Sequence, residues 1–244
     1  MEITAHAGMD GTSPNSRENL KAAILSDADI IEVDVRRNAQ GVLYLFHDVL
    51  TKPILEETID QRLTLDEAFD SIAGSGNKKI NCDLKEPGLE SHVHQLAREY
   101  GLQNRLIYTG TVQFPEEEMA WQSDVKVFYN LEHLLSSYSE NTSYKNNVQE
   151  SEENSIKRAA ETMWKNPPIG LVGWNVEVGV YLRNRSWFIE QGVPLSLWTV
   201  DEKETLETLF REHEAIIVNI TTRQVAMAEK IREAIERDFS THFQ

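Results

Sequence analysis

Short apolar runs rich in β-branched residues alternate with amphipathic segments along almost the whole chain. An apolar run of about four to eight residues is typical of a buried strand, whereas apolar positions three and four apart indicate a helix. Eight runs are predicted to be strands: residues 2–7, 29–35, 79–84, 105–110, 125–130, 169–175, 193–200 and 215–219. Strands that alternate with helices in this way predict a parallel sheet joined by crossover helices.

The helical segments lie between these strands, and several have recognisable ends. Ser16 precedes "RENL" as an N-cap, and Gly192 with Pro194 follows "WFIEQ" as a stop signal. Eight strand–helix units in series predict an α/β fold of the (β/α)8 TIM-barrel type, because open doubly wound sheets more often have about five or six strands. No boundary or repeat divides the sequence, so residues 1–244 are expected to form a single domain.

Three segments depart from the strand–helix rhythm. "GVLYLF" is a further extended run, which we interpret as an excursion after the second strand. Residues 51–78 then form a short cap insertion that contains a short helix. Residues 136–155 are polar and poor in apolar side chains, which is typical of a loop or a weak helix.

Composition restricts the partners and the compartment. Forty acidic and 24 basic residues give a formal net charge of -16, which argues against binding to nucleic acid or to an anionic membrane surface. A single cysteine, Cys82, excludes an internal disulfide and a cysteine-based zinc site. The start "MEITAHAG" lacks the features of a secretory signal, and no apolar stretch of about 20 residues occurs. A cytoplasmic protein without membrane insertion is therefore expected, and the oligomeric state is left open.

Ionisable residues gather where the first three barrel strands and the excursion end. In a barrel of this kind the sites lie at the carboxyl ends of the strands. The residues at these ends are His6, Glu32, Asp34, His47, Asp48, Asp83 and Lys85. Side chains two apart on a strand point to the same side, so Glu32 lies beside Asp34 and Asp83 beside Lys85.

Each of these features has a plain structural explanation when it is taken alone. Glu32 and Asp34 could form surface ion pairs, Asp83 and Lys85 a salt bridge, and His6 a core histidine. Inward-facing charges at three strand ends are nevertheless costly to desolvate unless they are paired or bound to metal. Three carboxylates suit a hard cation such as Mg²⁺ or Ca²⁺, and two imidazoles suit general acid–base chemistry.

These motifs together resemble those of the glycerophosphodiester phosphodiesterase family. They are "HAG", "PNS", "ADIIEVDV", "GVLYLFHD", "NCDLKEP" and "WTVD", in this order over nearly the whole chain. The resemblance implies a TIM barrel that uses a divalent metal to hydrolyse glycerophosphodiesters to glycerol 3-phosphate and an alcohol. It implies the following roles: Glu32, Asp34 and Asp83 as metal ligands, His6 and His47 as the acid–base pair, and Lys85 as a cation for the phosphate.

The sequence departs from the family pattern at three places. Ala7 stands where the family usually has a phosphate-binding arginine. Asp83 replaces the usual glutamate, as in the related sphingomyelinase D-like phospholipases. The insertion at 51–78 is smaller than in many members, so a more open pocket is expected.

Two further residues are candidates for substrate binding. Asn175 and Trp198 lie near the ends of the sixth and seventh predicted strands, where they could line the pocket, although packing at the barrel rim would explain Trp198 equally well. The histidines would transfer protons to and from a nucleophile and a leaving alkoxide, at a metal-bound phosphate. The expected partner is thus a small glycerophosphodiester.

Two alternatives remain open from the sequence. A sphingomyelinase D-like lyase could use the same residues and release a cyclic phosphate, but the toxins of that kind are secreted and disulfide-bonded. A barrel that binds phosphodiesters without catalysis would explain Ala7, but both histidines and all three carboxylates are present.

Overall fold

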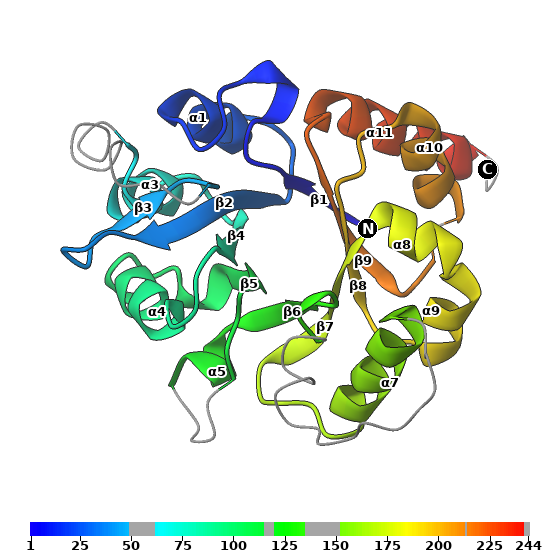
Figure 1. The fold of residues 1–244 in the computed structure, drawn as a ribbon. Coiled ribbons are helices and arrows are strands. Elements are labelled where there is room, and N and C mark those ends of the chain that lie inside the picture. Colours follow the sequence, from blue (N-terminus) through cyan, green and yellow to red (C-terminus); the bar gives the residue numbers. More distant parts are fainter. Residues whose placement is uncertain (49–61, 115–119, 135–151, 213, 242–244) are drawn as a thin grey trace.

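The computed structural model describes residues 1–48, 62–114, 120–134, 152–212 and 214–241. Within them, nine strands form one sheet (Figure 1). The strands are β1 Glu2–Ala5, β2 Ile30–Arg37, β3 Leu43–Leu45, β4 Lys79–Leu84, β5 Leu106–Gly110, β6 Lys126–Asn130, β7 Leu171–Glu177, β8 Leu195–Trp198 and β9 Ile217–Thr222.

The sheet closes on itself into a barrel. β1 pairs with both β2 and β9, and each neighbouring pair around the ring is parallel. β3 stands outside the ring and pairs with β2 in the antiparallel direction. The prediction of a (β/α)8 barrel with an excursion after its second strand is confirmed, and all eight predicted strands occur within a few residues of their expected bounds.

The helices surround the barrel on its outer side (Figure 1). They are α1 Arg17–Leu25, α3 Leu65–Ala73, α4 Glu90–Glu99, α5 Ala120–Asp124, α7 Glu152–Lys165, α8 Val178–Arg183, α9 Arg185–Gln191, α10 Lys203–Glu212 and α11 Val225–Thr241. Short 3-10 turns occur at Met9–Gly11 and Gln103–Arg105. Among the helices of the described segments, none is both long enough and apolar enough to cross a membrane.

Local sequence signals explain several helix ends. The Ser16 side chain accepts a hydrogen bond from the Asn19 N–H at the start of α1, as predicted. Thr64 and Glu67 form a reciprocal capping box at the start of α3. Gly192 ends α9 in the left-handed conformation, with φ of 64°, which glycine adopts without steric cost. These caps satisfy backbone groups that the helices themselves leave unpaired.

The apolar residues form two separate clusters. The larger cluster fills the space between the strands and the helices, and it includes Cys82 and Phe69, which are fully buried. The smaller one contains Ile30, Ile107 and Phe128 and closes the barrel at the amino ends of the strands. Above it, the buried residues of the barrel interior are largely polar. The core therefore leaves the carboxyl ends of the strands to polar chemistry.

The structure refines or corrects the sequence prediction at three places. Residues 152–155 belong to α7, at the end of the segment 136–155 that was predicted to be a loop or a weak helix. Helix α8 was not predicted, because "VEVGVY" reads as a continuation of the preceding β-branched strand. Strand β9 continues to Thr222, whereas the corresponding strand was predicted to end at residue 219. Residues 51–61 of the predicted cap and 136–151 of the predicted loop lie outside the described residues.

Candidate active site

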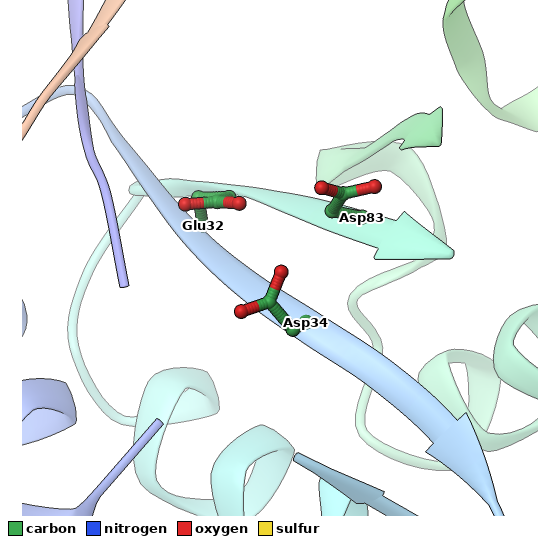
Figure 2. A group of neighbouring side chains, drawn as sticks. All are labelled: Glu32, Asp34 and Asp83. Atoms are coloured by element: carbon green, nitrogen blue, oxygen red, sulfur yellow. The ribbon is translucent and has the colours of Figure 1, made fainter. Parts of the chain in front are cut away.

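Three carboxylates meet at the carboxyl ends of β2 and β4 (Figure 2). Asp34 lies opposite Asp83 in the register of these strands, and Glu32 lies two residues before Asp34 on the same side. One oxygen from each of the three carboxylates lies within 4.8 Å of the others. Glu32 and Asp34 are buried, with 4% and 2% of their surface exposed. The sequence prediction of a common acidic group is thus matched by the geometry.

Neighbouring groups fix the orientation of two of these carboxylates. The Asn15 side chain donates to Asp34 Oδ2 at 2.6 Å and accepts from the Asp34 backbone N–H at 3.1 Å. The Ala7 backbone N–H donates to Glu32 Oε2 at 2.9 Å. Asn15 itself is buried and has a positive φ of 55°, a conformation that asparagine tolerates better than most residues. Asn15 belongs to the "PNS" motif of the sequence, but no contact with the carboxylates was predicted for it.

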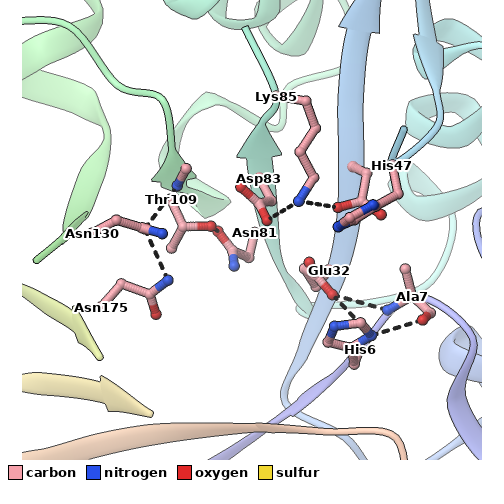
Figure 3. Close-up of polar contacts among 12 residues, drawn as sticks. His6, Ala7, Glu32, His47, Asn81, Asp83, Lys85, Thr109, Asn130 and Asn175 are labelled. Atoms are coloured by element: carbon pink, nitrogen blue, oxygen red, sulfur yellow. Dashed lines mark hydrogen bonds and ion pairs between the residues drawn. The ribbon is translucent and has the colours of Figure 1, made fainter. Parts of the chain in front are cut away.

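Lys85 connects the two aspartates. Its ammonium group lies 2.9 Å from Asp34 Oδ1 and 2.6 Å from Asp83 Oδ2 (Figure 3). Burial alone lowers the pKa of Lys85, but the charges of Asp83 and Asp34 outweigh burial and raise it. Lys85 therefore carries its positive charge at neutral pH and compensates part of the acidic group.

The negative charge of Glu32 is compensated less than the charges of Asp34 and Asp83, which Lys85 contacts. Burial of Glu32 raises its pKa to about 7; His6 opposes this rise, whereas the charges of Asp34 and Asp83 add to it. One oxygen of Asp83 also lacks a partner: Asp83 Oδ1 is buried and has no hydrogen-bond partner among the described residues. Both observations fit a site that accepts a hard cation, because carboxylate oxygens are the ligands that Mg²⁺ and Ca²⁺ prefer. The three residues thus form a possible metal site.

His6 lies beside Glu32 at the end of β1. Its Nδ1 is 2.7 Å from the Ala7 carbonyl oxygen and 3.8 Å from Glu32 Oε2. Because a carbonyl oxygen can only accept, Nδ1 carries the proton and Nε2 of the neutral ring is free of one. Burial lowers the pKa of His6, but Glu32, the Ala7 carbonyl and Asp34 together raise it above its ordinary value. His6 can therefore both hold and release a proton near neutral pH.

His47 is the more exposed of the two predicted histidines, with 64% of its side chain accessible. Its Nδ1 lies 2.9 Å from Asp48 Oδ1. The hydrogen bond to His47 lowers the pKa of Asp48, so this carboxylate is ionised and accepts the Nδ1 proton. Nε2 of neutral His47 is accordingly a proton acceptor, as in His6.

Arg36 links His47 to Lys85. Its guanidinium donates to the His47 carbonyl oxygen at 2.8 and 3.2 Å, and to the Lys85 carbonyl oxygen at 3.4 Å. Arg36 is buried, and it lies on β2 two residues after Asp34. It therefore ties the backbone that carries His47 to the strand that carries two of the carboxylates.

These side chains line a cavity of about 410 Å³ at the mouth of the barrel. The predicted residues that line it are His6, Glu32, His47, Asp83, Lys85, Asn175 and Trp198. Asn175 donates to Asn130 Oδ1 at 3.0 Å, and this oxygen also accepts from the Gly110 N–H (Figure 3). Trp198 Nε1 is buried and has no hydrogen-bond partner in the described part of the chain. The structure thus brings seven of the eight predicted site residues to one cavity. The eighth, Asp34, forms an ion pair with Lys85, which lines the cavity.

Several residues that line the cavity were not predicted from the sequence, and His133 and Arg223 are two that could take part in its chemistry. His133 follows β6, and its Nδ1 lies 3.1 Å from the Gly110 carbonyl oxygen. Arg223 follows β9, and Asp201 holds its Nε at 2.7 Å and its backbone N–H at 2.8 Å. The charge of Arg223 also lowers the pKa of His6, which shows that the guanidinium acts on the site. A lone histidine and a residue beyond the predicted end of the last strand gave no sequence signal.

Comparisons with known proteins connect this architecture to one group of enzymes. No protein-family model matches the sequence, and no curated protein matches it. Solved structures match over nearly the full length of both chains. A glycerophosphodiester phosphodiesterase from Thermotoga maritima is 20% identical, with a TM-score of 0.65 and coverage of 95% of this chain and 98% of that one.

Two further solved structures agree with this match. A glycerophosphodiester phosphodiesterase from Parabacteroides distasonis is 19% identical, with a TM-score of 0.62 and coverage of 96% and 97%. An Oleispira antarctica phosphodiesterase in complex with the product sn-glycerol-3-phosphate is 14% identical, with a TM-score of 0.64 and coverage of 96% and 97%. The chain therefore shares its whole-length fold with glycerophosphodiester phosphodiesterases.

Proposed function

We propose that this protein is a metal-dependent phosphodiesterase that hydrolyses glycerophosphodiesters to glycerol 3-phosphate and an alcohol. The observation that carries the proposal is the meeting of Glu32, Asp34 and Asp83 at the barrel mouth, in one cavity with two histidines. The shared fold supports it, and so does the sn-glycerol-3-phosphate bound to the Oleispira antarctica phosphodiesterase. Residues 1–244 would act as one catalytic domain.

Glu32, Asp34 and Asp83 would hold one Mg²⁺ or Ca²⁺ ion. A bound cation of this kind stabilises negative charge that develops on a phosphate group. Asn15 and the Ala7 N–H would keep two of the carboxylates in a binding orientation. The raised pKa of Glu32 supports this assignment, because a cation would relieve the repulsion that raises it.

His6 and His47 would carry out the two proton transfers. One removes a proton from the nucleophile, which is water or a hydroxyl of the substrate's own glycerol, and the other protonates the leaving alkoxide. In both rings Nδ1 is held by an acceptor, so Nε2 is the atom that exchanges the proton. The ring that acts as the base starts neutral, and the ring that acts as the acid starts as the imidazolium, with a proton on both nitrogens. Lys85, Asn175 and Trp198 would contact the substrate from the cavity wall.

Arg223 would supply the cation that Ala7 does not. The Ala7 side chain is a buried methyl group, and only its backbone N–H and carbonyl contact the site. Arg223 lines the same cavity from the end of β9, which pairs with β1 on the side away from β2. Asp201 fixes the position of its guanidinium. Asp201 Oδ2 already contacts the Nε and one terminal nitrogen of this guanidinium, so the phosphate would be bound by its other edge.

The test is the release of glycerol 3-phosphate from glycerophosphocholine and glycerophosphoethanolamine, with EDTA and then with added Mg²⁺ or Ca²⁺. His6→Ala and His47→Ala should each lower kcat by about 10² to 10⁴-fold, the range expected for loss of general acid–base catalysis. His92→Ala, on the exposed surface of α4, is the matched control and should leave kcat unchanged. Metal-independent turnover, or full activity of both variants, would contradict the proposal.

A further inference from the structure

A second cavity adjoins the proposed catalytic cavity. It has a volume of about 280 Å³ and lies among α7, α8 and α9 at the carboxyl end of β7. Most of the residues that form its wall are apolar, among them Leu131, Ile156, Val176, Val180, Trp187 and Phe188. The two cavities share Trp198 and Glu132, so a ligand that reaches from one into the other passes these two side chains.

The polar residues at the wall of this second cavity are already engaged. Both carboxylate oxygens of Glu177 accept backbone N–H groups at the start of α8, each at 2.9 Å. Lys157 pairs with Glu153 at 3.0 Å and lies over the Trp187 ring. Asn184 donates to the Val180 carbonyl oxygen at 3.2 Å. The fifth polar residue, Glu132, accepts from the Asn130 side chain at 2.8 Å where the two cavities meet. The contacts of these five side chains are made within the protein, so the cavity favours an apolar ligand over a polar one.

We propose that this second cavity binds an aliphatic chain attached to the phosphodiester substrate. The inference rests on the proposed function, and it narrows the substrate class to amphipathic glycerophosphodiesters with one apolar chain. The phosphate would lie among the carboxylates and Lys85, while the chain would pass Trp198 and lie between Val180 and Ile156.

The size of the cavity sets the length of the chain. A volume of about 280 Å³ holds roughly nine groups of the size of a water molecule or a methylene. Each buried methylene is worth about 0.8 kcal/mol, which corresponds to roughly a fourfold gain in affinity. Affinity is therefore expected to rise with chain length up to an octyl or nonyl group and then to level off.

The chain could be attached to either alcohol of the diester, and two probes distinguish these sources. The first is 1-O-octyl-glycero-3-phosphocholine, in which the glycerol carries the chain. The second is the octyl ester of glycerol 3-phosphate, in which the leaving alcohol carries it. Glycerophosphocholine, which has no chain, is the reference compound for both.

Binding is measured by titration calorimetry and by tryptophan fluorescence in EDTA, because Trp187 and Trp198 both line the cavity. The wild-type protein should bind at least one octyl compound more than about tenfold tighter than glycerophosphocholine. Val180→Trp, which fills the cavity from α8, should abolish this preference. Leu182→Trp adds the same side chain to the same helix at a position that is 46% exposed, and it should retain the preference.

Ile156→Trp, from the opposite wall on α7, repeats the test if Val180→Trp does not fold. Equal affinity of the wild-type protein for the octyl compounds and glycerophosphocholine would overturn the inference, as would a preference that survives both tryptophan substitutions. Turnover of glycerophosphocholine is followed in parallel and should be unchanged in all three variants. If the wild-type protein shows no chain preference but turns over glycerophosphocholine, only the second cavity is refuted. Chain-dependent binding by the wild-type protein without any metal-dependent turnover refutes only the proposed function.

Discussion

Glu32 is the residue at which burial and charge conflict most directly. Its side chain is fully enclosed beside two other carboxylates, so the neutral form is favoured and the pKa is raised from 4.5 to about 7. In the metal-free folded protein, Glu32 therefore binds a proton that it loses in the unfolded chain. This group's contribution to the free energy of unfolding is thus largest below pH 4.5 and is lost as the pH rises to about 7.

The same proton must leave when a metal binds, so metal affinity should depend on pH. We expect the dissociation constant for Mg²⁺ or Ca²⁺ to be on the order of tenfold higher at pH 6 than at pH 8, as measured by titration calorimetry. Glu32→Gln cannot ionise, so it should bind more weakly and with a smaller pH dependence. Equal affinity of the wild-type protein at both pH values would show that Glu32 releases no proton when the metal binds, and unchanged affinity of Glu32→Gln would show that Glu32 is not a ligand.

Arg223 provides a second test at the scale of one residue. If it binds the substrate phosphate, Arg223→Ala should raise KM by about tenfold to a hundredfold, which corresponds to the loss of a charge-assisted hydrogen bond. Arg223→Lys should recover part of the effect. Lys203→Ala removes a cation that pairs with Glu207 outside the catalytic cavity, and KM should then be unchanged. A similar rise in KM for Lys203→Ala would point to general electrostatics and not to a phosphate contact.

At the scale of elements, the end of β5 provides the space that Asp83 needs. Gly110 ends this strand with φ of 79°, and a Cβ atom there would lie 2.1 Å from Asp83 Oδ1. Gly101, which follows α4, also has a positive φ, of 67°, but an added Cβ would have no neighbour within 4 Å. A Cβ at Gly110 would also lie 2.4 Å from the Leu84 carbonyl oxygen of β4. Gly101 therefore reports the cost of backbone conformation alone, whereas Gly110 adds the displacement of Asp83 and of the neighbouring β4 backbone.

Both Gly101→Ala and Gly110→Ala should lower the free energy of unfolding, by at least about 1 kcal/mol, because alanine disfavours the left-handed conformation. Only Gly110→Ala should also weaken metal binding, by about tenfold to a hundredfold, because it moves a ligand. Chemical denaturation and metal titration of the two variants measure these effects. Unchanged metal affinity in Gly110→Ala would exclude Asp83 from the metal site.

The arrangement of elements also shows why α8 escaped prediction. It begins directly after β7, and Glu177 is both the last residue of the strand and the N-cap of the helix. Valines 176, 178 and 180 alternate through this junction, so the local pattern favours an extended chain. The capping contacts of Glu177 decide for a helix, and they depend on side-chain geometry that the pattern does not contain.

At the scale of the molecule, the order of strands and most of the acidic site could be predicted from the sequence. Strand periodicity places Glu32 beside Asp34, and the barrel topology brings β4 next to β2, so Asp83 follows. Arg223 and His133 could not be found in this way, because their positions depend on where β9 and β6 end and on contacts with Asp201 and Gly110. Residues far apart in sequence meet there only after the barrel has closed.

Because the chain as a whole is strongly acidic, binding of an anionic substrate would depend on the few cations near the cavity. A net charge of -16 repels a phosphodiester from most of the surface. Lys85 and Arg223 line the cavity at the barrel mouth, and Arg36 lies behind it against the backbone of His47 and Lys85. Substrate binding would therefore depend on local positive charge and on metal, and EDTA should abolish turnover without unfolding the barrel.

Phosphorus NMR of glycerophosphocholine incubated with the protein tests the proposed activity most directly, since it resolves the diester, the monoester and a cyclic ester in one spectrum. We predict that the diester signal is replaced by that of glycerol 3-phosphate when Mg²⁺ or Ca²⁺ is present, and that it persists in EDTA. A cyclic phosphate that accumulates as the final product would contradict simple hydrolysis. No change in the spectrum with either metal would contradict the proposed activity toward this diester.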